Sequence, residues 1–87
     1  METSTQKQTN YGISEQQLKD IDNRFTYHTP KHDQTTRYAV LRAIAKEYAK
    51  AITRYCPNSR EKSLAITKLE ESVMWANASI ARNENAN

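Results

Sequence analysis

Flat rings alternate with cations between positions 24 and 32, where the chain reads Arg-Phe-Thr-Tyr-His-Thr-Pro-Lys-His. Nucleobases stack on such rings, and Arg or Lys neutralises phosphate, so these residue types suit a nucleotide-like anion. From this segment we assign ligand binding to Arg24, Tyr27, His28 and Lys31. The alternative, equally consistent with the sequence, is a loop whose Tyr27 and Pro30 only cover the end of a pair of helices.

Four more polar side chains extend this candidate site. Arg37 and Arg42 fall just inside the helix that we predict to follow the segment, where the backbone also attracts anions. The alternative for both is an ordinary solvated helix face. Asn77 and Arg82 lie near the end of the last predicted helix, and we expect them to reach a ligand held at an interface between chains.

Metal binding and catalysis are not expected. His28 and His32 have the spacing of a helical metal pair, but Pro30 lies between them and disfavours a helix there. Cys56 has no partner at motif spacing, and the single glycine excludes a glycine-rich phosphate loop. We therefore predict a binding protein with neither a catalytic residue nor a bound metal or cofactor.

The composition favours one small helical domain. The chain has 87 residues, 37% of them hydrophobic, with one Gly and two Pro, so the many turns of a β-protein are not available. Cys56 cannot form an intrachain disulfide, and no signal peptide or membrane-spanning run is recognisable. We expect a cytosolic protein without a membrane partner.

The predicted fold is all-α, a short N-terminal helix followed by a long antiparallel helical hairpin. We expect a disordered arm over residues 1–12 and a single helical domain over 13–83, with helices at about 14–25, 36–55 and 59–83. Ser14 and Gln17 have capping-box spacing, and Asn58 with Glu61 resembles a second one. The short link around Pro57 predicts that the last two helices are antiparallel neighbours.

The last predicted helix is apolar on two opposite sides. Rotation by about 100° per residue gathers Ile66, Leu69 and Val73 in one stripe and places Leu64 and Trp75 on the far side. One partner helix cannot cover both sides. We therefore predict a homo-oligomer with Leu64 and Trp75 at its interface.

A recognisable combination of residues is spread over the segments 21–31, 33–34, 37–38, 59–65, 69–71, 73–78 and 80–83. Its final stretch, which reads Val-Met-Trp-Ala-Asn-Ala at 73–78 and Ile-Ala-Arg-Asn at 80–83, is specific rather than compositional. Together these segments, which extend over about residues 21–83, resemble a family of small phage proteins, the cyclic-nucleotide sponges used against bacterial CBASS and Thoeris immunity.

This resemblance implies a helical-hairpin protein, assembled as a compact hexamer, that acts in the cytoplasm of the infected bacterial host. It would bind cyclic dinucleotides, cyclic trinucleotides or cyclic ADP-ribose isomers between protomers without cleaving them. Tyr27 and His28 would stack on bases, while Arg24, Lys31 and Arg37 would neutralise phosphates. Relatives often have Lys-Gly-Asp-Gln where this chain has His at position 32, so its loop is expected to be less flexible.

Two other functions fit the residues alone. A net charge of +3 and a pI of about 9.1 suit a small nucleic-acid-binding module, although the chain lacks the dense basic stripe that long nucleic acid requires. A small adaptor protein, whose exposed helix faces dock on a larger partner, is the other alternative.

Overall fold

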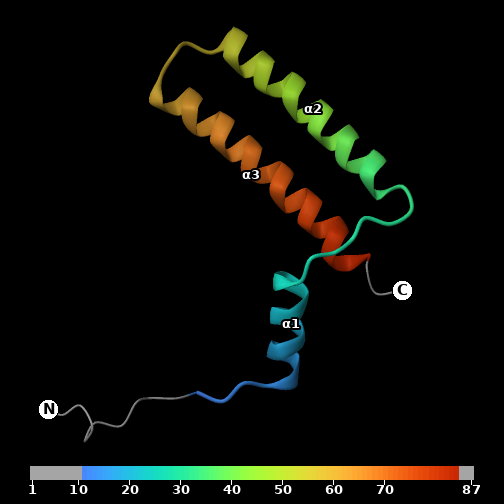
Figure 1. Ribbon diagram of the computed structural model, residues 1–87. Coiled ribbons are helices and arrows are strands. Elements are labelled where there is room, and N and C mark those ends of the chain that lie inside the picture. The colour runs from blue at the N-terminus through green and yellow to red at the C-terminus, as the bar shows by residue number, and fades with distance from the viewer. Residues whose placement is uncertain (1–10, 85–87) are drawn as a thin grey trace, which may run out of the picture.

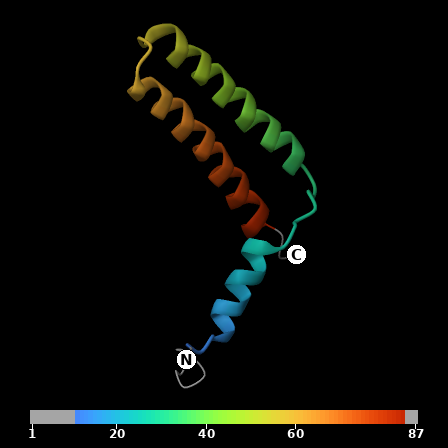
Figure 2. The same ribbon diagram turned by 60° about the vertical axis from the view of Figure 1, so that its left-hand side comes forward.

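The computed structural model describes residues 11–84, which form three helices and no strand (Figure 1). Helix α1 spans Glu15–Phe25, α2 spans Gln34–Tyr55 and α3 spans Arg60–Asn83. Helices α2 and α3 lie side by side and antiparallel in both views, and α1 projects from the open end of this hairpin (Figure 2). The predicted short helix and hairpin are thus confirmed. Most of the predicted N-terminal arm, residues 1–10, lies outside the described residues.

The capping box predicted at the start of α1 is confirmed. Ser14 Oγ accepts a hydrogen bond from the Gln17 N–H at 3.0 Å, and Gln17 Oε1 accepts one from the Ser14 N–H at 2.8 Å. Along the rest of α1, Leu18, Ile21 and Phe25 remain exposed, and no residue of this helix is buried. The isolated chain therefore gives α1 a defined start but little packing.

Helix α2 begins two residues earlier than predicted. Asp33 is its N-cap but makes no capping hydrogen bond through its side chain. Instead, Gln34 Oε1 accepts a hydrogen bond from the Lys31 N–H at 2.9 Å, and the Gln34 N–H donates to the Lys31 carbonyl at 2.9 Å. These reciprocal bonds close the turn in place of an ordinary cap, which is why the helix starts at Gln34.

The link between α2 and α3 differs from the predicted Asn58–Glu61 capping pair. Ser59 is extended and its Oγ accepts from the Lys62 N–H at 3.1 Å, so Ser59 is the N-cap of α3. Asn58 Oδ1 instead accepts from Lys62 Nζ at 2.7 Å. The same ammonium donates to the carbonyls of Thr53 at 3.1 Å and Cys56 at 3.3 Å, so it closes the C-terminal end of α2.

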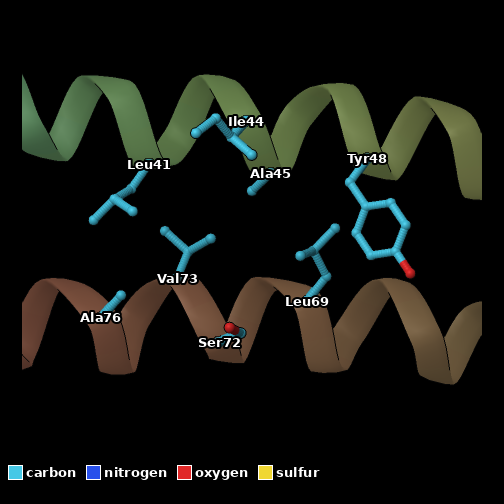
Figure 3. Close-up of a pocket in the computed structure, with 8 residues that line it drawn as sticks. All are labelled: Leu41, Ile44, Ala45, Tyr48, Leu69, Ser72, Val73 and Ala76. Carbon is cyan, nitrogen blue, oxygen red and sulfur yellow. The ribbon is translucent and has the colours of Figure 1, made fainter.

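The core between the two long helices is thin. Small and branched side chains of α2 and α3 point toward one another between the helices (Figure 3). The meeting residues that the figure labels are Leu41, Ala45 and Tyr48 on α2 with Leu69, Val73 and Ala76 on α3. Yet Ile52, at 9% exposure, is the one buried apolar residue in the described part of the chain. The radius of gyration is 20.3 Å, against about 12 Å for a globular domain of this length.

Each of the two long helices carries a stripe of exposed large apolar side chains, and we call the two stripes together the outer apolar face. Helical rotation groups Val40, Ile44, Tyr48 and Tyr55 on α2, and it groups Leu64 and Trp75 on α3. Trp75 is 61% exposed although its Nε1–H donates to Glu71 Oε2 at 3.3 Å and the Arg82 guanidinium lies 5.9 Å from its ring centre. The two-sided character predicted for the last helix is present in the structure.

No helix among residues 11–84 is long and apolar enough to span a membrane.

Candidate functional site

An open cavity of about 420 Å³ lies where α1 and the segment after it meet the open end of the hairpin. We call it the junction cavity. Its lining residues are Arg24, Thr26, Tyr27, His28, Tyr38, Arg42, Asn77, Ala78, Ala81 and Arg82. Six of the eight predicted ligand-binding residues are among them, although they come from three separate parts of the sequence. The volume falls within the range of pockets that hold small organic ligands, about 300–1,000 Å³.

The junction cavity is positively charged. Arg24, Arg42 and Arg82 contribute guanidinium groups, and none of the lining residues is acidic. The nearest acidic partner of Arg24 is Asp20, one helical turn away at 3.8 Å, and both side chains of this pair are mostly exposed. Such an exposed ion pair is weak, so an incoming phosphate can compete for the guanidinium. The electrostatics therefore favour an anion.

Rings and hydrogen bonds join the three parts of the cavity wall. Tyr27 is 81% exposed, and its ring can therefore be covered by a ligand. His28 Nε2 lies 2.8 Å from the Asn23 carbonyl, which can only accept, so this nitrogen carries the proton. Asn23 Nδ2 in turn donates to the Arg82 carbonyl at 3.1 Å. This chain of bonds fixes the end of α1 and the following segment against the end of α3.

Asn77 presents an unmet acceptor at the cavity wall. Its Oδ1 is buried and has no hydrogen-bond partner among the described residues. A buried polar atom left without a partner costs about 1–3 kcal/mol. A ligand or a second chain that supplies an N–H or O–H donor would recover that energy.

Arg37 and Lys31 lie outside the lining of the junction cavity. Arg37 donates to Glu84 through both terminal nitrogens and to Asp33 Oδ1 through Nε at 3.2 Å. The hydrogen bonds to Glu84 raise the pKa of Arg37 further above its ordinary value. Hydrogen bonds from Arg37 and then Gln34 lower the pKa of Glu84 from 4.5 to about 2. Carboxylates already compensate the charge of Arg37.

Sequence reasoning missed part of the cavity wall. Tyr38 shares the three- and four-residue spacing of the apolar side chains of α2, a pattern that predicts a place between the helices, but it also lines the cavity. Ala78 and Ala81, three residues apart on α3, line it too and leave the helix backbone approachable. Small residues at this spacing beside Asn77 and Arg82 were the signal available in the sequence.

The two residues predicted for the oligomer interface, Leu64 and Trp75, are exposed on α3 and are not among those that line the cavity. They do not line the groove of about 230 Å³ between α2 and α3 either (Figure 3). On α2, Ile44 borders this groove whereas Arg42 lines the cavity, and the two residues are about 160° apart around the helix. On α3 the cavity and the apolar face adjoin, because Arg82 lines the cavity and its guanidinium lies 5.9 Å from the Trp75 ring centre.

No cluster of three or more potential metal ligands occurs in the described part of the chain.

Comparison with protein families gives one match that covers most of the chain. Residues 17–81 match the family described as Acb2/Tad1, hairpin domain. The matched range contains α2, most of α1 and α3, and the junction cavity apart from Arg82. No curated protein and no solved structure matched.

Proposed function

Because the chain belongs to the Acb2/Tad1 hairpin family, the phage cyclic-nucleotide sponges, we propose that it sequesters cyclic nucleotide messengers of the infected host and so blocks CBASS or Thoeris immunity. The observation that carries the proposal is the junction cavity, which gathers three guanidinium groups, two tyrosines and a histidine. The proposed mechanism is stoichiometric. One bound messenger is one messenger withheld from the host effector.

The chemistry of the cavity matches that of a cyclic dinucleotide. Such a ligand carries two phosphates and two flat bases, so burying it requires paired cations and stacking surfaces. Arg24, Arg42 and Arg82 provide the cations, while Tyr27 and His28 provide rings. Cyclic trinucleotides and cyclic ADP-ribose isomers share these groups and are included in the proposed range.

Asn77 supplies the element that distinguishes a base from a simple phosphate. An amide offers both a donor and an acceptor, the arrangement that pairs with the edge of adenine. The Oδ1 of Asn77 lacks a hydrogen-bond partner among residues 11–84, so contact with an exocyclic amino group would satisfy it.

We propose that the complete pocket forms between protomers of a homo-oligomer, a hexamer. Effective competition with a host receptor needs a dissociation constant near a nanomolar, about 12 kcal/mol of binding free energy. A cavity open to solvent within one chain leaves much of the ligand exposed. The outer apolar face, with Leu64 and Trp75, gives a second copy a surface on which to pack, and Arg82 brings this surface next to the cavity, since it lines the cavity and lies 5.9 Å from the Trp75 ring centre.

Calorimetry tests the proposal. Cyclic di-AMP, cyclic di-GMP, cyclic tri-AMP and cyclic ADP-ribose are titrated into the wild-type protein, and at least one should bind at submicromolar concentration. Ligand released by heating the complex should have its original mass, because we propose binding without cleavage. If none of the four cyclic nucleotides binds at micromolar protein, the protein does not sequester them. A released product of altered mass would indicate an enzyme.

A basic ridge on α2 favours the nucleic-acid-binding alternative. Arg42, Lys46, Lys50 and Arg54 follow one another at four-residue intervals, and all are exposed. Contacts with phosphates would make the affinity fall steeply with salt. Gel shifts with duplex DNA and single-stranded RNA at low salt separate the two functions, since a messenger sponge should leave both probes unshifted.

A further inference from the structure

A hydrogen-bonded cluster joins the two free ends of the hairpin, and we call it the end clamp. It consists of Gln34 and Arg37 on α2, Asp33 before them, and Glu84 at the end of α3. Gln34 Nε2 donates to Glu84 Oε1 at 3.1 Å, and the Arg37 guanidinium bonds both oxygens of the same carboxylate. Gln34 is 4% exposed, the one buried polar residue in the described part of the chain.

The clamp is connected to the turn that presents Lys31. Gln34 Oε1 accepts from the Lys31 N–H, and the Gln34 N–H donates to the Lys31 carbonyl. Between them, His32 adopts φ 52°, a left-handed conformation that costs energy for a residue with a Cβ. The turn therefore needs support from outside itself to keep this shape.

Glu84 decides which way the Gln34 amide faces. A carboxylate can only accept hydrogen bonds, so the amide must direct its NH₂ group at Glu84. Its oxygen then faces the Lys31 N–H, which is the bond that closes the turn. Arg37 fixes the carboxylate in turn by a two-point contact. A side chain at the end of α3 thereby sets backbone geometry more than fifty positions earlier in the chain.

From this chain of contacts we infer that Glu84 is a positioning residue: acting through Gln34, it sets the backbone of the turn that carries Lys31 and thereby the affinity for the cyclic nucleotide. The effect on affinity rests on the proposed function, whereas the effect on the turn does not. Lys31 follows directly on the segment that contains Tyr27 and His28. A turn held in one shape places its ammonium relative to the cavity before the ligand arrives, which lowers the entropic cost of binding.

Two substitutions of Glu84 separate its effect on the orientation of the Gln34 amide from the effect of its negative charge. Glu84→Ala removes the acceptor for Gln34, while Glu84→Gln keeps an acceptor oxygen and removes the ion pair with Arg37. Glu47→Ala is the matched control, because Glu47 is an exposed carboxylate that pairs with Lys50 on α2. Circular dichroism verifies that each variant keeps its helices.

Amide hydrogen exchange at Lys31 is the first measurement, made on the full chain without ligand. We expect Glu84→Ala to accelerate exchange by about tenfold, Glu84→Gln by clearly less, and Glu47→Ala by less than twofold. The second measurement is affinity for whichever of cyclic di-AMP, cyclic tri-AMP and cyclic ADP-ribose binds the wild type most tightly. We expect about a tenfold loss in Glu84→Ala and partial rescue in Glu84→Gln.

Exchange at Lys31 that is unchanged in Glu84→Ala would overturn the inference. So would faster exchange combined with unaltered affinity, because the clamp would then be structural only. If no probe binds the wild type, the proposed function fails and the inferred control of affinity fails with it. The exchange data still decide separately whether Glu84 sets the turn.

Discussion

The guanidinium of Arg37 holds the carboxylate of Glu84 by two parallel hydrogen bonds, Nη1 to Oε2 at 2.9 Å and Nη2 to Oε1 at 2.5 Å. The contact joins the first turn of α2 to the residue that ends α3, 47 positions later. It closes the open end of the hairpin beside the junction cavity. The assignment of Arg37 to ligand phosphate stays a prediction, and a phosphate would have to displace Glu84 to meet it.

The first prediction concerns pH. The pKa of Glu84 is lowered from 4.5 to about 2 in the folded chain. The stabilisation from this carboxylate is therefore complete above pH 4.5 and is lost as the pH falls toward 2. We expect the Tm of the wild type to fall through this window more steeply than that of Glu84→Gln, by differential scanning fluorimetry. If the Tm of the wild type and of Glu84→Gln depends on pH in the same way, the prediction is wrong.

The second prediction separates ligand binding from assembly. Tyr27→Ala should weaken messenger binding about tenfold or more, because a ring that stacks on a base is lost. The mass of the oligomer by light scattering should not change. Tyr11→Ala is the control, since Tyr11 is 89% exposed and lies outside the cavity lining, and it should bind as the wild type does. Equal losses in both variants would remove Tyr27 from the site.

The third prediction places the contact between copies on the outer apolar face. Trp75→Ala should lower the oligomer mass measured by light scattering, because exposed aromatic anchors dominate such interfaces. Met74→Ala is the control: Met74 is 64% exposed, close to the 61% of Trp75, but lies about 100° away around α3. It should keep the mass of the wild type. If only Met74→Ala lowers the oligomer mass, the interface lies on the side of α3 that carries Met74.

The fourth prediction concerns the closed end of the hairpin. Lys62→Met removes an ammonium that donates to Thr53 O, Cys56 O and Asn58 Oδ1. We expect the free energy of unfolding to fall by about 1 kcal/mol, measured with urea. Lys68→Met is the control, because Lys68 is 73% exposed and, within the part of the chain that the structure describes, pairs only with Glu71 on its own helix. The two variants should therefore differ, and equal stabilities would show that the cap contributes nothing.

The fifth prediction concerns the left-handed residue. His32 has φ 52°, so His32→Gly should relieve strain and raise the free energy of unfolding by about 0.5–1 kcal/mol. His32→Ala keeps a Cβ at the same backbone angles and should gain nothing. A stability for His32→Gly at or below that of His32→Ala would show that the turn is not strained.

The sequence predicted what depends on local pattern. Periodicity placed the three helices, and the spacing of Ser14 and Gln17 predicted a cap that the structure contains. Local pattern does not predict contacts between residues that are distant in the sequence. Glu84 carries no signal that identifies Arg37 as its partner, and the early start of α2 follows from that same cluster.

The candidate site likewise has a part that the sequence predicts and a part that depends on the fold. Residue chemistry identified Arg24, Tyr27 and His28 because rings and cations adjoin in the sequence. Their convergence with Asn77 depends on the antiparallel return of α3, which only the fold provides. Tyr38 was missed because a tyrosine in an apolar stripe has the same sequence signature whether it fills a core or borders a cavity.

Ile52 is the one apolar side chain enclosed in the described part of the chain, so if the protein assembles as proposed, a newly synthesised copy gains much of its stability only on meeting another. Dilution would then unfold the protein, and host proteases would degrade the unfolded copies. If the assembled protein also sequesters messengers as proposed, the number of working molecules in an infected cell would rise more steeply than the number translated, so the timing and strength of expression would set the threshold at which host signalling is silenced.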